Sequence, residues 1–447
     1  MTSTPSSAPE AALTGSLRDF RAPVGPDLVG RVGEFYAWQD LRREHELWPY
    51  ARSPSTAPQA RCDARSDTGS VFSGINFASQ DYLSLSSHPA VKAAAIEAIG
   101  EYGVHSAGSA ALLGNTANSV RLETELSTFL VREIVLYPTG WAAGYGSIQG
   151  FVRAKDHVVM DILAHSCLQE GAKAATQNIH YHGHLNLDAL TRKLQRIRDE
   201  DSENGIMVVT ESLFSMHSDT PDLGALRALC DEYRATLLVD CAHDLGSIGE
   251  DGLGHLGLQN MLDGADIIIG SFSKTFASNG GFIAVRDRAT AEYLRYYSAT
   301  HTFSNALSPV QAATVLKALE IVRSEEGRQL RRQLMDNILL LRSEMAAAGL
   351  EVLGDPSPIV PVSIGLEGVG RFASRNLMAL GGIANLVEYP AVPQGAARFR
   401  FQVMASHTPD DIRQVVEILA RAMRDADLEY RLAHEGRMQA PKATAAA

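Results

Sequence analysis

Short apolar runs that alternate with longer amphipathic segments constrain the fold of this chain more than any other feature. Between the runs, segments such as Leu187–Ile197 and Leu223–Tyr233 carry apolar residues at helical spacing. The length and β-branched content of the runs predict buried strands. Strands that alternate with helices predict an α/β fold, with a mostly parallel sheet covered by helices on both faces. The runs are Val158–Met160, Ile206–Val209, Leu237–Val239 and Ile267–Ile269.

The N-terminal part of the chain lacks this alternation. Residues 1–71 predict an N-terminal arm, with a disordered tail over residues 1–15 and a loop rich in Pro, Ser, Ala and Arg over residues 51–70. Residues 72–308 then predict the large domain that contains the parallel sheet.

The C-terminal part predicts a smaller α+β domain over residues 309–435, followed by a disordered tail over residues 436–447. Its expected elements are a long helix over Pro309–Ala348, short strands near Ile359–Ile364 and Arg398–Met404, and a helix over Pro409–Met423.

Composition narrows the class of protein. The net charge of -12 gives no basic surface for nucleic acid, and no apolar run is long enough to cross a membrane. The N-terminus has no apolar stretch of the signal-peptide kind. The 4 cysteines lie far apart without a CxxC pair, which argues against a disulfide framework and a zinc site and favours reduced thiols. We expect a cytoplasmic protein without a metal, a membrane contact or a nucleic-acid partner.

Chemically active side chains follow three of the predicted strands. The first strand ends in the hydroxyl-rich segment Thr210–Ser215, and the second ends in Asp240, with His243 three residues later. Lys274 follows the third strand, among serine and threonine residues. Ligands of open α/β sheets bind beyond the carboxyl ends of the strands. These side chains therefore predict a ligand-binding site at the carboxyl ends of the strands.

Lys274 is the most informative of these residues. A lysine is costly to desolvate unless it is paired or used as a neutral amine, and Schiff-base chemistry is the main reason to place one at a strand end. Asp240 would keep a pyridinium nitrogen protonated, so that the ring of pyridoxal phosphate (PLP) acts as an electron sink. The alternative is an ordinary buried Asp–Lys pair. The other six lysines suit solvated surface, namely Lys92, Lys155, Lys173, Lys193, Lys317 and Lys442.

Further motifs occur in a fixed order along the chain. With Ser271–Lys274 they resemble the motifs of the α-oxoamine synthases, a family of fold-type-I PLP-dependent transferases, from about Asn76 to Met423. The resemblance implies PLP as cofactor. The segments are Asn76–Leu83, Tyr102–Gly114, Tyr137–Ala143, Asp161–His165, Phe214–Met216, Phe303–Asn305 and Arg398–Arg400.

The resemblance assigns cofactor contacts at both ends of the ring. At the phosphate end, Gly140 and Trp141 match the turn whose backbone amides hold the phosphate, as suits an anion at a helix start. Ser271 matches a phosphate ligand, and Ser304 matches a serine that reaches the phosphate of the neighbouring subunit. Trp141 has the alternative of a core aromatic residue.

At the ring itself, His165 matches the histidine that stacks on the pyridine, although a lone histidine is more often structural. Ser215 and His243 match the pair that bonds the phenolic oxygen. Together with Lys274 and Asp240, the two histidines make up the expected catalytic set.

On the substrate side, Arg400 matches the arginine that grips the amino-acid carboxylate, with a solvated strand arginine as the alternative. Gln80 stands where the family usually has asparagine near that carboxylate. Ala110 replaces an arginine, which makes Ser109–Leu113 small and apolar and favours an uncharged, apolar acyl chain. The chain also departs from the family at Ala164, His217 and Ser218.

The resemblance implies a homodimer with shared active sites. It implies the condensation of an amino acid with an acyl thioester of CoA or of an acyl-carrier protein, with release of carbon dioxide and free thiol, to give an α-amino ketone. Two alternatives remain open: an aminotransferase on the same fold, and a catalytically silent partner subunit, against which Lys274 counts strongly.

Overall fold

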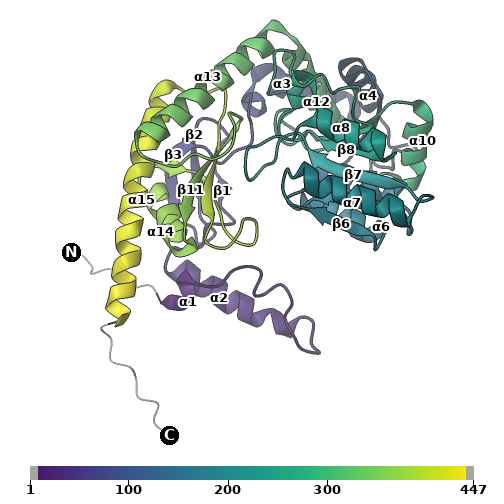
Figure 1. Cartoon of the computed structure of the whole chain (residues 1–447). Coiled ribbons are helices and arrows are strands. Elements are labelled where there is room, and N and C mark those ends of the chain that lie inside the picture. Colours follow the sequence, from purple (N-terminus) through teal and green to yellow (C-terminus); the bar gives the residue numbers. More distant parts are fainter. Residues whose placement is uncertain (1–8, 439–447) are drawn as a thin grey trace. The chain divides into compact units, whose positions relative to one another are not determined.

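The computed structural model describes residues 9–438, and its contacts divide the chain into two units (Figure 1). The large unit spans Gln80–Asp336 and includes Met404–Ser406. The small unit combines residues 9–79 with Asn337–Val403 and with the chain from His407 onward. The sequence analysis predicted domain boundaries after residues 71 and 308, and it treated the N-terminal arm and the C-terminal domain as separate parts. In the structure these two parts of the chain pack together.

A seven-stranded sheet forms the centre of the large unit and confirms the predicted fold class. The strand β10 (Gly281–Val285) is antiparallel to both of its neighbours, and the other pairs are parallel. The sequence analysis did not identify β10. The order is β4 (Glu133–Tyr137), β10, β9 (Ile267–Ser271), β8 (Thr236–Asp240), β7 (Ile206–Glu211), β5 (His157–Asp161) and β6 (Ile179–His182).

Both faces of this sheet are buried, as the continuous apolar runs predicted. On one face, Val158, Met160 and Ile269 join the core formed with α5 (Gly140–Phe151) and α6 (Ser166–Ala175). The alternate residues, such as Val159, Val208 and Ile268, point to the opposite face and are equally buried. The helices α7 (Leu187–Glu200) and α8 (Leu223–Glu232) pack against β5, β6 and β8.

The sequence analysis did not predict a break in the long helix that follows the large unit's sheet. The expected helix over Pro309–Ala348 is two helices, α12 (Pro309–Arg323) and α13 (Glu325–Ala347). They are separated at Ser324, whose backbone is extended and whose hydroxyl donates to the carbonyl of Ile321 at 2.7 Å. The other helices of the large unit are α3 (Pro89–Tyr102), α4 (Ala117–Leu130), α9 (Gly254–Leu258), α10 (Arg288–Tyr297) and α11 (Ala299–Thr302).

Two small sheets form the small unit together with α14 (Glu367–Ala379) and α15 (Pro409–Met438). The expectation of a loop over residues 51–70 is wrong, because this stretch contains β1 and β2. Parallel pairing of β12 with β3 joins the N-terminal arm to the C-terminal segment. The sheets are β1 (Ser53–Pro54), β2 (Arg61–Arg65), β3 (Val71–Asn76) and β12 (Gly382–Ile383), and β11 (Ile359–Gly365), β14 (Ala397–Gln402) and β13 (Asn385–Val387).

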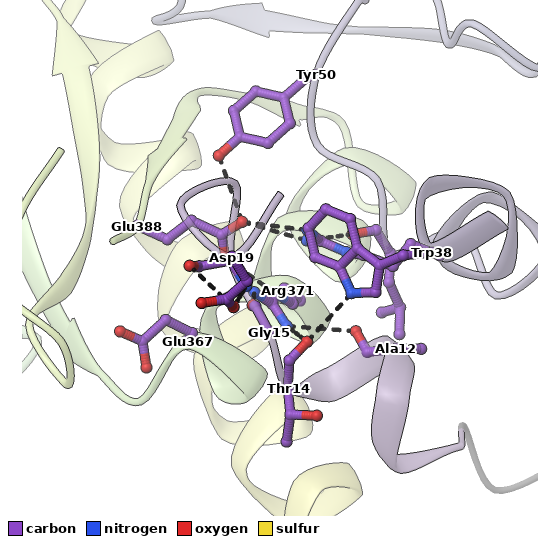
Figure 2. Close-up of polar contacts among 12 residues, drawn as sticks. Ala12, Thr14, Gly15, Asp19, Trp38, Tyr50, Glu367, Arg371 and Glu388 are labelled. Carbon is purple, nitrogen blue, oxygen red and sulfur yellow. Dashed lines mark hydrogen bonds and ion pairs between the residues drawn. The ribbon is translucent and has the colours of Figure 1, made fainter. Parts of the chain in front are cut away.

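The start of the arm is held in the small unit by two arginines and one carboxylate (Figure 2). Arg371 donates to the carbonyls of Thr14 and Gly15, and its Nε lies 2.9 Å from Glu388. Arg42, on α2 (Gly33–Glu44), pairs with the same carboxylate at 3.3 Å.

Parts of the two expected disordered tails are helical in the structure. Residues 9–15 include the helix α1 (Glu10–Leu13), and α15 continues to Met438. The rest of the two tails, residues 1–8 and 439–447, lies outside the described residues.

Candidate active site

A cavity of about 260 Å³ opens at the carboxyl ends of the parallel strands in the large unit. The end of β8, the loop after β9 and the first turn of α5 contribute to its walls. These segments come from distant parts of the sequence, and the sheet brings them together because its parallel strands end at one edge. Seven of the predicted residues line the cavity: Gly140, Trp141, His165, Asp240, His243, Ser271 and Lys274.

The first turn of α5 offers backbone donors at one end of the cavity. Thr139 caps the helix, with its hydroxyl 3.0 Å from the N–H of Ala142. The N–H groups of Gly140 and Trp141 find no acceptor among the residues that the structure describes. A Cβ on Gly140 would lie 2.5 Å from the Cβ of Ser271, so only glycine allows this close approach. Free N–H groups at a helix start, beside a serine hydroxyl, suit a phosphate.

Two carboxylates also line the cavity. Asp240 ends β8, and one of its oxygens accepts from the N–H of Ala242 at 2.9 Å. Glu211 ends β7 directly opposite Asp240 in the parallel ladder and lines the same cavity. Burial raises the pKa of Asp240, an effect that the charges of His165 and Lys274 oppose. Burial, and then the charge of Asp240, raise the pKa of Glu211 well above its ordinary value. One of the two groups therefore holds a proton more readily than a solvated carboxyl does.

His165 stands at the N-cap of α6 in a defined orientation. Its Nδ1 accepts from the N–H of Cys167 at 3.3 Å and lies 3.0 Å from the Cys167 sulfur. Burial raises the pKa of the Cys167 thiol, so the sulfur keeps its proton. These two contacts fix the orientation of the imidazole ring.

The structure places the other predicted residues outside the walls of this cavity. Ser215 is buried in the turn after β7, and Ser304 lies half-buried after α11. Gln80 is half-buried at the start of the large unit. Arg400 belongs to β14 in the small unit and is only 8% exposed, so the alternative of a solvated arginine is wrong.

The residues of the cavity fit PLP on structural grounds. The unpaired amides of α5 and Ser271 suit its phosphate, and Asp240 suits its ring nitrogen. Lys274 follows β9, which lies between β4 and β8 in the strand order of the sheet, and it lines the same cavity. The chain therefore supplies every residue that this fit requires.

Comparison with known proteins gives the family. Residues 73–419 match the model of the family described as aminotransferase class I and II. The chain belongs to this family. Serine palmitoyltransferase of Sphingobacterium spiritivorum is 33% identical over 406 residues, which cover 90% of this chain and 98% of the relative. The 8-amino-7-oxononanoate synthase of Trichlorobacter lovleyi is 34% identical over 372 residues, which cover 83% and 92%.

A solved structure shows the same fold. A serine palmitoyltransferase from S. paucimobilis, with a bound PLP–myriocin aldimine, superposes with a TM-score of 0.84 at 24% identity and covers 90% of this chain and 100% of that one. Within the aminotransferase class I and II family, this chain is a PLP-dependent acyltransferase of the α-oxoamine synthase type. The family resemblance and the cofactor predicted from the motifs are confirmed.

Several features of the described residues bear on the other expectations. All four cysteines are buried free thiols, as predicted. No helix within residues 9–438 is long and apolar enough to cross a membrane. The same residues contain no cluster of three or more His, Cys, Asp or Glu side chains placed to hold a metal ion.

The sequence analysis missed two residues of the site and one that contacts a site residue. Glu211 lies two residues after the predicted strand Ile206–Val209, and this strand-end position was an available signal, whereas its place opposite Asp240 in the ladder comes from the structure. Thr139 precedes the glycine of the phosphate turn and has the hydroxyl typical of an N-cap. Tyr82 lies within a matched motif, but its partner is 161 residues away, so no local pattern could reveal the pair.

Proposed function

We propose that this enzyme joins an amino acid to an apolar acyl thioester at the cavity around Lys274. Carbon dioxide and the free thiol leave, and an α-amino ketone forms. The observation that carries the proposal is the sharing of one cavity by Lys274, Asp240 and the unpaired amides of α5. A lysine amine, a carboxylate and a phosphate site are the three groups that PLP chemistry requires.

Lys274 is proposed to act twice. Its amine would hold the cofactor covalently and, when free, would remove the Cα proton of the amino acid. PLP, when bound, accepts the negative charge that this proton removal leaves on the substrate. The carboxylates around Lys274 support the second role, because Asp240 and Glu211 both interact with its charge.

Asp240 and the two histidines are proposed to set proton positions around the ring. Asp240 would hold a proton on the ring nitrogen. His165, with its Nδ1 already engaged by Cys167, would present its ring to the cofactor. His243 would donate from Nε2 to the phenolic oxygen, together with Ser215.

Arg400 is proposed to bind the substrate carboxylate. With the amide of Gln402 oriented to satisfy its neighbours, the Gln402 oxygen accepts from Nε of Arg400 at 2.6 Å and from a terminal nitrogen at 2.9 Å. This contact holds the guanidinium plane in place, which suits recognition of a carboxylate. Gln80 is the second proposed substrate contact.

The preference for an apolar acyl chain rests on the stretch around Ala110. Ser109 donates to the carbonyl of Thr302 at 2.7 Å, so this stretch is tied to the segment that precedes Ser304. Small apolar residues without an arginine would stabilise a bound acyl chain by roughly 0.8 kcal/mol for each buried methylene. They offer no partner to a terminal carboxylate.

A homodimer with shared active sites is also proposed. Leu112, Leu113 and Phe303 are 84%, 94% and 87% exposed in the single chain. Phe303 directly precedes Ser304, the residue proposed to reach the partner's phosphate, and Leu112 and Leu113 follow Ser109, which bonds Thr302. Exposed apolar groups of this size mark interaction surfaces. Free cysteines support a reducing, cytoplasmic location.

The experiment measures products directly. Holoenzyme is mixed with an amino acid and an octanoyl thioester of CoA, and carbon dioxide and free thiol are counted. We expect equal amounts of both, and neither without the thioester. An aminotransferase would instead release a 2-oxo acid from the amino acid alone, and this result would overturn the proposal. A succinyl thioester that reacts as fast as the octanoyl thioester would overturn the acyl preference.

A further inference from the structure

His184 joins two segments of the large unit that carry residues assigned to the active site. It follows β6, the edge strand of the seven-stranded sheet, and does not line the cavity of Lys274. Its imidazole is half-buried and lies between two carboxylates, that of Asp161 at the end of β5 and that of Asp219 in the loop after β7. None of the roles assigned above uses His184.

The contacts of His184 require a charged imidazole. Its Nδ1 lies 3.0 Å from Oδ1 of Asp161, and its Nε2 lies 2.9 Å from Oδ2 of Asp219. A carboxylate only accepts hydrogen bonds, so both ring nitrogens have to donate, and only the imidazolium has two N–H groups. Burial lowers the pKa of His184, but these bonds outweigh burial and raise the pKa to about 9, so the ring keeps its charge at neutral pH. Charge-assisted bonds of this kind are stronger than bonds between neutral groups.

On one side, His184 acts on the turn that leads to His165. Asp161 is buried, and its carboxylate also accepts from the N–H of Leu163 at 2.8 Å. Its carbonyl accepts at 3.0 Å from the N–H of Ala164, the residue directly before His165. The position of Asp161 therefore determines where this turn places His165, which lines the cavity.

On the other side, His184 acts on the loop that carries Ser215. The carbonyl of Asp219 accepts from the N–H of Phe214 at 2.9 Å, which closes this loop around Ser215. The ring of Phe214 meets the imidazole edge to face, with the ring centroids 4.6 Å apart. His184 thus contacts the loop through a carboxylate and through an aromatic ring.

The order of the strands explains why one side chain joins these segments. β5 lies between β6 and β7, so a residue that follows β6 reaches the loop after β7 across the end of β5. The three strands are parallel and have their carboxyl ends at one edge of the sheet. The two contacts assigned to the cofactor ring, His165 and Ser215, therefore depend on how the two segments are placed relative to each other. A binding site requires such placement to hold within about 0.5 Å.

We propose that His184 is a positioning residue of the cofactor site. Through Asp161 and Asp219 it holds the turn of His165 and the loop of Ser215 in the relative position that bound PLP requires. The inference rests on the cofactor roles proposed for His165 and Ser215, and it adds the side chain that sets both at once. Without the imidazolium, the two carboxylates lose their shared cation and repel each other.

The test uses full-length holoenzyme and two measurements. Visible circular dichroism reports how the bound cofactor is oriented, and dilution gives the rate at which PLP is released. His184→Phe keeps a ring but removes both N–H groups. It should release PLP about tenfold faster and weaken the visible dichroism, because the charge-assisted bonds are lost. His184→Lys keeps a cation that can donate to both carboxylates, and it should bring the release rate back toward that of the parent.

His157→Phe is the matched control. His157 stands at the opposite end of β5, where it is half-buried and lies 3.1 Å from Asp201 and 3.1 Å from His180. Its loss should lower the melting temperature but change neither the dichroism nor the release rate. A His184→Phe variant that also changes only the melting temperature would have lost a purely structural contact, and this result would overturn the proposal.

Two further variants separate failure of this inference from failure of the cofactor assignments. His165→Ala and Ser215→Ala should each alter the dichroism, and parental spectra in both would refute the roles on which the inference rests. If His184→Phe fails to fold, Asp219→Asn decides, because it removes the charge of the more exposed carboxylate only. It should speed PLP release several-fold, and an unchanged release rate contradicts the assignment.

Discussion

The phenolic oxygen of Tyr82 lies 2.9 Å from Nδ1 of His243, and both side chains are buried. His243 lines the cavity of Lys274, whereas Tyr82 does not. If Tyr82 donates, Nδ1 accepts and the ring proton stays on Nε2, the nitrogen proposed to donate to the cofactor. Tyr82 is thus a positioning residue that acts through His243.

Replacement of this tyrosine tests the relationship. Tyr82→Phe should lower kcat roughly tenfold and shift the pH titration of the bound cofactor's visible absorbance, because His243 loses the bond that selects its tautomer. Tyr233→Phe removes a comparable hydroxyl that bonds Gln195, outside the cavity, and should change neither quantity. An unshifted titration in Tyr82→Phe would leave Tyr82 a purely structural role.

Lys274 should be the lysine that binds PLP covalently, because it is the lysine of the cavity. Lys274→Ala should lose the visible absorbance of the lysine-bound cofactor, and borohydride should no longer fix PLP to the chain. Lys317→Ala, at a surface lysine paired with Glu320, is the control and should behave as the parent. Mass spectrometry of the reduced protein reads out the site, and a label on another lysine would refute it.

Asp240→Asn keeps the shape of the side chain and removes its charge. Exchange of the substrate Cα hydrogen with deuterated solvent, followed by NMR, should slow on the order of a thousandfold, since the ring nitrogen loses its anionic partner. Asp266→Asn removes a carboxylate that pairs with Arg227 outside the cavity and should leave the exchange rate near the parent's. Parental exchange in Asp240→Asn would rule the role out.

His184 should make stability depend on pH. Burial lowers its pKa, but bonds to Asp161 and Asp219, at 3.0 and 2.9 Å, outweigh burial and raise the pKa from 6.5 to about 9. A base whose pKa is raised on folding contributes stability that is complete below its unfolded pKa and is lost as the pH rises through its folded pKa.

The melting temperatures of the parent and of His184→Gln should therefore differ most below pH 6.5, and the difference should shrink toward pH 9. A His184 difference that stays constant with pH contradicts the charged assignment.

Glu388 should be the most sensitive polar residue of the small unit (Figure 2). It is buried and receives bonds from Arg42, Arg371 and Tyr50. Glu388→Gln leaves two buried arginines without a counter-charge and should lower the free energy of unfolding by about 3–5 kcal/mol. Glu367→Gln, which alters an exposed bond to the Gly395 N–H, should cost less than about 1 kcal/mol in the same denaturant titration.

The sequence by itself determined the centre of the large unit and the chemistry of its edge. The runs that became β5, β7, β8 and β9 are long enough and apolar enough to be buried on both faces, and parallel strands have their carboxyl ends at one edge. Asp240 and Lys274 directly follow such runs, so their meeting in one cavity follows from local pattern and sheet geometry.

Only the tertiary structure decided which distant segments pack together. Glu388 lies 346 residues from Arg42, and Tyr82 lies 161 residues from His243. β12 joins the arm to the C-terminal segment through a pairing of two residues, too short to leave a periodic signal. Local periodicity reports which face of an element is buried, but not what buries it. The partner depends on shape and charge complementarity across the whole chain, which emerges only when the elements are assembled.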